Sequence, residues 1–255
     1  MSTYLVTGSA SGMGRATADR LVANGHSVIG VDLNNADISA DLSTPEGRRT
    51  VLDSAPAMLD GAVCCAGLVG LTGRPGSSLV SVNYFGTVEV LAGLKDRFTP
   101  GSSVVLFSSN STTVQPGWDP DLVDACLSGD EPAARALADE AESLSVYPAT
   151  KVALVRWMRR NLGSWIEQGV RVNAVAPGLI QTAMTDSVRQ DPTLGSLIDA
   201  FPVPAGRPGT AQEVAALTAF LLSPEASYLF GSFIVIDGGT EALLRPDDWP
   251  ARWEV

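Results

Sequence analysis

The sequence predicts an α/β fold built as a single doubly wound parallel sheet with helices on both faces. Two observations lead to this prediction. Short apolar runs alternate with amphipathic stretches along the chain, which is typical of strands and crossover helices in a parallel sheet. The first apolar run ends in a glycine-rich turn that leads directly into a helix-like stretch. A chain of 255 residues is long enough for one well-buried domain, and we expect residues 1–255 to form it.

Each expected element follows from this alternation. The expected strands are the apolar runs at 3–7, 27–31, 61–65, 103–108, 170–175 and 232–236. The expected helices are the amphipathic stretches at 14–24, 45–55, 77–97, 130–142, 146–167 and 211–222. Right-handed crossovers would bring the carboxyl ends of the strands to one edge of the sheet. Residues that follow different strands are therefore expected to form one site.

The turn after the first strand carries Gly8, Gly12 and Gly14. Glycines let the chain turn sharply and let a diphosphate approach the backbone, while the following helix N-terminus offers free N–H groups. The next strand ends at Asp32, where a carboxylate can hold the hydroxyls of an adenosine ribose. The alternative is a plain glycine turn with an unrelated aspartate. The order of strand, glycines, helix, strand and acid favours a Rossmann-like dinucleotide site.

The surroundings of Asp32 favour NAD over NADP. A carboxylate accepts hydrogen bonds from a free 2′-hydroxyl and repels a 2′-phosphate, which an NADP site usually pairs with a nearby arginine. Leu33, Asn34 and Asn35 follow Asp32, and none of them is basic, while Arg15 lies within the helix start. We therefore predict NAD as the cofactor.

Tyr147 and Lys151 have the i, i+4 spacing that places two side chains on one face of a helix. A nearby ammonium would lower the pKa of the phenol from its ordinary value of about 10, which would make it an acid and base usable near neutral pH. The same spacing also occurs by chance on solvated helices, so its weight depends on the rest of the chain. The only histidine, His26, lies in a turn before a strand, which leaves Tyr147 as the credible acid/base.

With these two sites, the sequence resembles the short-chain dehydrogenase/reductase family over nearly its whole length. Tyr147 and Lys151 match the family's catalytic pair. Ser109, at a strand end, matches the catalytic serine, and Asn83 matches the helix asparagine. The resemblance implies reversible hydride transfer between a nicotinamide cofactor and an alcohol or carbonyl carbon. It further implies that Tyr147 moves the oxygen-bound proton and that Ser109 polarises the oxygen. Lys151 would hold the nicotinamide ribose, and Asn83 would orient a water beside that lysine.

The resemblance also implies a set of cofactor contacts. Asp41 and Leu42 match the acid and apolar pair beside the adenine, and Cys65 stands where the family has the asparagine of Asn-Ala-Gly. Pro177 begins the loop that grips the nicotinamide carboxamide. The expected cofactor-binding residues are Gly8, Ser11, Gly12, Met13, Gly14, Asp32, Leu33, Asp41, Leu42, Cys65, Ala66, Gly67, Tyr147, Lys151, Pro177, Gly178, Ile180 and Thr182.

The substrate implied by the resemblance is a small carbonyl or alcohol compound. The stretches 38–47, 65–68, 80–86 and 222–228 are similar to members that act on hydroxysteroids and other carbonyl compounds, so a steroid is one candidate. Two alternatives remain. One is a dehydrogenase for a smaller alcohol, a sugar or an acyl intermediate. The other is a regulator that binds NAD without turnover, against which the intact catalytic set argues.

The stretch 111–145 is longer than in a typical family member, and residues 130–142 have a helical pattern of their own. This extra helical segment is either a wall or lid over the substrate or a surface insertion that alters subunit contacts. In many members the tyrosine-bearing helix packs on a partner subunit, so a bulky segment before it would force a different dimer. We expect a homodimer or homotetramer, a mostly apolar pocket, and a lid at 182–201.

Charge and composition argue against several other functions. The net charge of −11 argues against nucleic acid and anionic membranes as partners. No apolar run of about 18 residues predicts a spanning helix, and no basic leader precedes the first strand, so we expect a cytoplasmic protein. Cys64, Cys65 and Cys126 lack the spacing of a zinc site, so no metal is expected. A tail with Trp249 and Trp253 ends the chain and would pack on a neighbouring subunit or line the pocket.

Overall fold

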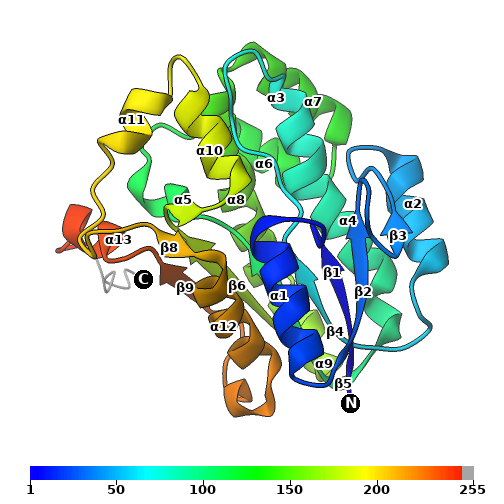
Figure 1. Ribbon diagram of the computed structural model, residues 1–255. Helices are drawn as coiled ribbons and strands as arrows, with labels where there is room; N and C mark the ends of the chain where they lie inside the picture. Colours follow the sequence, from blue (N-terminus) through cyan, green and yellow to red (C-terminus); the bar gives the residue numbers. More distant parts are fainter. Residues whose placement is uncertain (249–255) are drawn as a thin grey trace.

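The computed structural model describes residues 1–248 (Figure 1). Residues 249–255, with Trp249 and Trp253, lie outside the described part, so the packing of the tail and the domain boundary at 255 stay predictions. Within residues 1–248, seven strands form one parallel sheet in the order β3-β2-β1-β4-β5-β6-β9. These strands are β1 (Thr3–Thr7), β2 (Ser27–Asp32), β3 (Ile38–Ser39), β4 (Leu59–Cys64), β5 (Phe98–Phe107), β6 (Arg171–Pro177) and β9 (Phe233–Ile236).

Helices connect the strands and cover both faces of the sheet. A short second ladder pairs β7 (Ile180–Gln181) with β8 (Gly209–Thr210). The longer helices are α1 (Gly12–Ala23), α2 (Pro45–Ser54), α4 (Gly86–Leu94), α6 (Pro120–Ser128), α7 (Glu131–Glu140), α8 (Ser143–Arg160), α10 (Ala183–Gln190) and α12 (Ala211–Leu222). The shorter helices are α3 (Gly76–Leu79), the π-helix η1 (Val80–Phe85), the 3₁₀ helices η2 (Lys95–Arg97) and η3 (Pro224–Ala226), α5 (Ser111–Val114), α9 (Leu162–Glu167), α11 (Gly195–Asp199) and α13 (Thr240–Leu244).

Alternate strand residues supply two apolar cores, because successive side chains of a strand point to opposite faces. Leu5 and Leu106 belong to the core that α2, α4 and α8 cover, while Val6 and Val105 belong to the core that α1 and α12 cover. Figure 1 shows α1 and α12 side by side on the near face of the sheet, and these two helices contact each other. The predicted doubly wound α/β fold is therefore confirmed.

The expected elements are all present, with differences in length and number. β3 was not predicted, because two residues are too few for a periodicity and the pairing of β3 with β2 defines it. The expected helix at 77–97 is a series of α3, η1, α4 and η2, and the expected helix at 146–167 divides into α8 and α9 at Asn161. Residues 111–140 hold α5 and α6 besides the expected helix, which is α7.

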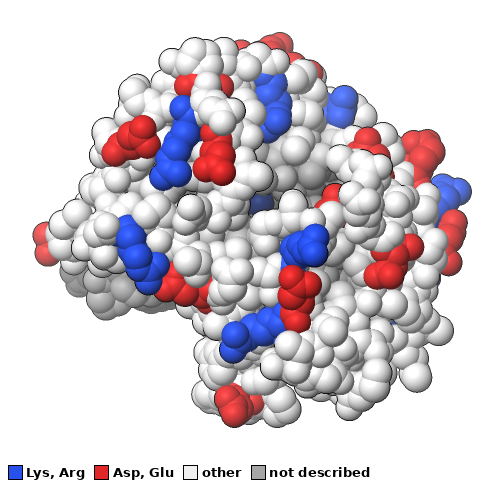
Figure 2. Space-filling view, in the orientation of Figure 1, with Lys and Arg blue, Asp and Glu red and all other residues white. Residues whose placement is uncertain are grey.

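The surface carries charge of both signs. Figure 2 shows acidic and basic side chains interspersed over the face seen in Figure 1, with uncharged atoms over most of its centre. In the part of the chain that the structure describes, no helix has the length and apolar character needed to cross a membrane.

Candidate active site

The turn after β1 is shaped so that its backbone borders an open cavity. Gly8 and Gly12 adopt left-handed φ values of +72° and +54°, which glycine alone adopts without strain. A Cβ atom on Gly14 would lie 2.1 Å from the carbonyl oxygen of Gly8. The N-cap residue of α1, Ser11, makes no side-chain cap hydrogen bond, so its hydroxyl does not occupy the first amides of the helix. This arrangement suits a phosphate group.

The acid expected at the ribose lies at the same edge. Asp32 ends β2, and its Oδ2 accepts a hydrogen bond from the amide of Ala10 at 2.9 Å, while Oδ1 accepts one from the amide of Leu33 at 2.7 Å. These bonds hold the carboxylate beside a cavity of about 390 Å³. Thirteen expected cofactor residues line that cavity: Gly8, Ser11, Gly12, Met13, Gly14, Asp32, Leu33, Asp41, Leu42, Cys65, Ala66, Gly67 and Thr182.

The residue that departs from the family pattern, Cys65, lies in this cavity wall. Burial raises the pKa of its thiol to about 12, so Cys65 is a neutral thiol at physiological pH. It therefore adds a small, weakly polar surface to the cavity rather than a charge.

A second cavity, of about 420 Å³, adjoins the first. Met13, Thr182 and Met184 line both. The second cavity holds the other expected site residues apart from Asn83 and Lys151: Ser109, Tyr147, Pro177, Gly178 and Ile180. Its remaining wall is mostly apolar and includes Val69, Val114, Leu144, Leu179, Val188, Leu194, Leu197, Ile198 and Phe201. Together the two cavities make one cleft with a glycine-lined half, which holds Asp32, and a more apolar half.

Tyr147 and Ser109 meet in the apolar half. The Ser109 Oγ accepts a hydrogen bond from the amide of Ser111 at 3.1 Å. Burial raises the pKa of Tyr147, and a hydrogen bond with Ser109 opposes that rise. The net direction is opposite to the lowering expected from Lys151. The reason is that the phenol is withdrawn from water, while the Lys151 ammonium, 5.9 Å from the ring centre, donates to the carbonyl of Phe107 at 2.9 Å.

Lys151 and Asn83 lie behind the two cavities. Burial lowers the pKa of Lys151 to about 8. Asn83, in η1, is held by its own amide group: Oδ1 accepts from the amide of Leu68 at 2.7 Å, and Nδ2 donates to the carbonyl of Leu68 at 2.9 Å and to Thr150 Oγ1 at 3.2 Å. A Cβ atom on Gly67 would lie 3.2 Å from Asn83 Oδ1 and 3.4 Å from Lys151 Nζ. Asn83 and Lys151 therefore approach the same small space, which Gly67 leaves open.

Sequence reasoning missed the residue that ties the serine loop to the last strand. Asn110 donates from Nδ2 to Asp237 Oδ2 at 3.1 Å, and the amide of Asn110 donates to the carbonyl of Pro177 at 3.0 Å. The amide of Gly178 donates to the carbonyl of Ile236 at 3.0 Å. The sequence offers one signal for this role, which is that Asn110 directly follows Ser109. Its hydrogen-bond partner Asp237 is 127 positions away, so no local pattern links the two residues.

The expected lid at 182–201 contains α10 and α11, and it is fastened to the loop after β4. Asp191 accepts hydrogen bonds from the amide of Thr72 at 2.7 Å and from its hydroxyl at 2.8 Å. Desolvation raises the pKa of Asp191, but hydrogen bonds from Thr72, Thr193 and Leu194 outweigh it and lower that pKa to about 2. The contact joins the two segments that border the apolar cavity, and no feature of the sequence indicated it.

Known proteins are similar to the chain over nearly its whole length. The chain is 40% identical over 96% of its length to the 3-alpha-hydroxysteroid dehydrogenase/carbonyl reductase of Comamonas testosteroni, of which it covers 99%. The chain belongs to the short-chain dehydrogenase/reductase family. The chain is also 32% identical to the coniferyl-alcohol dehydrogenase of a Pseudomonas strain, over 92% of this chain and 94% of the relative. The resemblance stated from the sequence is therefore confirmed.

A solved structure also matches this chain over nearly its whole length. The crystal structure of the 3-alpha-hydroxysteroid dehydrogenase from Pseudomonas sp. B-0831 complexed with NADH has a TM-score of 0.92 and 42% sequence identity. The match covers 97% of this chain and 100% of that one. A family model described as enoyl-(acyl carrier protein) reductase matches residues 133–241.

Proposed function

We propose that the protein is an NAD-dependent oxidoreductase that interconverts a secondary alcohol, a hydroxysteroid or similar compound, and its ketone. One observation carries the proposal. The phenol of Tyr147 and the hydroxyl of Ser109 line one mostly apolar cavity, and this cavity adjoins a glycine-lined cavity of dinucleotide type. Family membership and the relatives named above support the same reaction.

The cofactor half of the cleft suits NAD. The left-handed glycines and the uncapped start of α1 would hold the diphosphate, and Asp32 would hold the adenosine ribose. Leu33, Asn34 and Asn35 offer no cation to a 2′-phosphate, and Arg15 pairs with Asp19 at 3.8 Å. Held by these residues, NAD would supply the hydride acceptor for oxidation of the alcohol, and its reduced form would supply the hydride donor for the reverse reaction.

The protein's own groups would move the proton. Tyr147 would take the hydroxyl proton as the alcohol is oxidised and return it in the reverse direction. Ser109, whose Oγ already accepts from the Ser111 amide, would donate its own proton to the substrate oxygen and polarise it. Lys151 and Asn83 would hold the nicotinamide ribose and an ordered water in the space beside Gly67.

The wall of the second cavity favours a bulky apolar substrate over a sugar. Burying sugar hydroxyls against Val114, Leu179 and Ile198 would leave them without hydrogen-bond partners, which is unfavourable. A flat polycyclic alcohol would instead bury apolar surface there. We also infer a homo-oligomer in the cytoplasm, as expected from the sequence.

Absorbance of reduced nicotinamide tests this proposal. The protein is mixed with NAD and a 3α-hydroxysteroid, with NADP in a parallel cuvette and the Asp32→Ala variant alongside. We expect growth with NAD, weak growth with NADP, and a smaller preference for NAD in the variant. Intact NAD binding without growth on the steroid would contradict the steroid assignment. Absence of growth on a wider panel of secondary alcohols would contradict the enzymatic function itself.

A further inference from the structure

We propose that Glu131 and Arg135, on helix α7, are positioning residues for Asn83, and that they act through Ser81 in the π-helix η1. This inference rests on the proposed function, in which Asn83 belongs to the active site. It assigns a role to the extra segment before Tyr147 that is neither a substrate wall nor a subunit contact.

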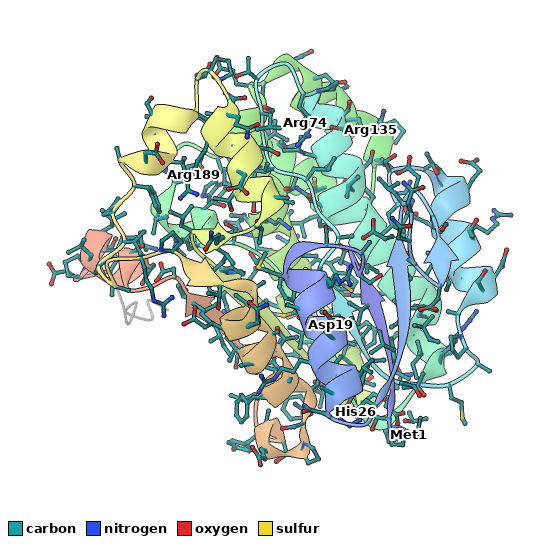
Figure 3. All side chains as sticks on the ribbon, viewed as in Figure 1. Met1, Asp19, His26, Arg74, Arg135 and Arg189 are labelled. Atoms are coloured by element: carbon teal, nitrogen blue, oxygen red, sulfur yellow. The ribbon has the colours of Figure 1, made fainter. Side chains whose placement is uncertain are left out.

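The contact between α7 and η1 is a buried polar cluster around one hydroxyl. The Ser81 hydroxyl donates to Glu131 Oε1 at 2.6 Å and accepts a hydrogen bond from Arg135 Nη1. Ser81 is completely buried, so no water competes for these bonds. Figure 3 labels Arg135 where α7 lies beside α3, the helix that continues into η1.

Glu131 is itself fixed from a third element. Its Oε2 lies 2.6 Å from Nη2 of Arg48 on α2, and Glu89 on α4 lies 3.2 Å from Nε of the same arginine. The Arg48 side chain is 3% exposed, so its charge depends on these carboxylates for compensation. Because Arg48 fixes the Glu131 carboxylate in place, its Oε1 atom is a well-positioned acceptor for the Ser81 hydroxyl.

Ser81 and Asn83 share the short π-helix. Residues two apart in a helix point to roughly opposite sides, so Ser81 can contact α7 while Asn83 faces Leu68. The π-helix is a rare form of helix, and it is found frequently at functional sites. Its geometry therefore needs support from outside, and the bonds to Ser81 provide that support two residues from Asn83.

Other contacts of the same segment restrain the chain just before η1. Asp139 Oδ1, on α7, accepts from the amide of Ser77 at 2.8 Å, which provides α3 with a cap. A Cβ atom on Gly76 would lie 2.0 Å from the carbonyl oxygen of Ala138, so α3 and α7 are in close backbone contact. Residues 76–81 are therefore held against α7 along their length.

Four variants separate positioning from stability. Glu131→Ala removes the acceptor for Ser81 and the partner of Arg48, whereas Glu131→Gln keeps an acceptor oxygen but removes the charge. Ser81→Ala removes the hydroxyl and leaves the pair of Glu131 and Arg48 in place. Glu140→Ala, on the exposed side of α7, is the matched control. Each variant is assayed for kcat, for the KM of NAD and for thermal stability. Hydrogen exchange of the Leu68 amide is measured as well, because this amide donates a hydrogen bond to Asn83 Oδ1.

We expect these variants to differ in kcat, in thermal stability and in the exchange of the Leu68 amide. In Glu131→Ala and Ser81→Ala, kcat falls about tenfold, KM for NAD stays close to the wild-type value, and the Leu68 amide exchanges faster. Glu131→Gln loses thermal stability, because the buried Arg48 guanidinium keeps only the half-exposed Glu89 as a carboxylate partner, yet it retains most of kcat and the slow exchange of Leu68. Glu140→Ala resembles the wild type in every measurement.

Two outcomes would overturn the inference. One is unchanged Leu68 exchange in Glu131→Ala and Ser81→Ala. The other is equal loss of kcat in Glu131→Gln and Glu131→Ala, which would make Glu131 a purely structural charge partner. The exchange measurement needs no turnover. If the wild type oxidises no alcohol while Leu68 exchange still rises in both variants, the proposed function fails and the support of Asn83 by α7 stands.

Discussion

Tyr147 is partly buried and lines an open apolar cavity, so its hydroxyl can be removed with little effect on packing. We expect Tyr147→Phe to fold and to bind NAD, because the glycine loop and Asp32 are untouched. Turnover should fall about 10²- to 10⁴-fold, the range typical of losing a positioned acid/base. Steady-state kinetics with a cofactor titration checks both parts. Tyr228→Phe removes a phenol that is 97% exposed and serves as control. Wild-type rates in Tyr147→Phe would contradict the acid/base role.

The buried ammonium of Lys151 should appear in the pH dependence of stability. Its folded-state pKa of about 8 lies below the ordinary 10.5, because burial disfavours the charge. Between these values the unfolded chain binds more protons than the folded protein, so the free energy of unfolding should rise with pH across this window. Urea unfolding at a series of pH values measures the slope.

The matched variant for that measurement is Lys151→Met, which keeps the length of the side chain and removes the charge. Its free energy of unfolding should lack the component that rises between pH 8 and 10.5. An identical slope in wild type and variant would show that Lys151 is not the group that titrates.

At the level of single residues, the sequence predicted best where backbone geometry dictates the residue type. The glycines and Asp32 line one cavity as expected, because a sharp turn and a strand end leave few alternatives. The direction of the Tyr147 pKa shift was predicted wrongly. Spacing along a helix shows that Lys151 is near, but it does not show how deeply the surrounding chain buries the phenol.

Among the elements, η1 shows why a periodic pattern is insufficient. Residues 77–97 are helical throughout, as predicted, yet the turn at Val80–Phe85 is a π-helix. Its apolar residues fit an α-helical pattern equally well, and the hydrogen bond from Ser81 to Glu131 joins residues too far apart in the sequence for such a pattern to report it. The two helices at 111–128 were missed for different reasons: α5 has only four residues, which are too few for a periodicity, while the start and end signals of α6, Asp119 with Pro120 and then Gly129, were overlooked.

The lid is the element whose attachment can be tested most directly. Arg189, labelled in Figure 3, joins α10 to α11 through Asp199 at 3.3 Å, and Asp191 fastens the pair to Thr72. In Asp191→Ala we expect KM for a bulky alcohol to rise several-fold and residues 183–199 to exchange hydrogen faster, because the restraint on the lid is lost. Asp186→Ala, which breaks only a 3.7 Å contact within α10, is the control.

The same fastening should not depend on pH in the assay range. Hydrogen bonds hold the pKa of Asp191 at about 2, so its carboxylate stays ionised at neutral and mildly acidic pH. A KM for the bulky alcohol that rises at pH 5 in the wild type, but not in Asp191→Ala, would contradict this assignment.

For the whole molecule, the position of α6 predicts how subunits can associate. α6 packs along α8 and buries Leu122, Val123 and Cys126. Just before α6, the centre of the Trp118 ring lies 5.0 Å from Cζ of Arg156 on α8. A partner subunit would not reach that side of α8. We expect a homodimer formed by another surface, and light scattering measures its mass. A tetramer built through α8 would contradict this expectation.

A candidate for that other surface is the segment after the middle of α12, drawn orange in Figure 1. Phe220, Tyr228 and Phe230 are 40%, 97% and 37% exposed there. Tyr228→Asp should lower the dimer's mass to that of a monomer at micromolar concentration, because a charge would be buried in the interface. Met58→Asp, at a position 70% exposed, controls for added charge. An unchanged mass in Tyr228→Asp would place the contact elsewhere.

The two halves of the cleft share Met13, Thr182 and Met184 as a common wall. A substrate bound beneath α10 would contact these three side chains, and the nicotinamide end of the cofactor would have to pass them to enter or leave. The cofactor should therefore enter first and leave last, in a compulsory sequence.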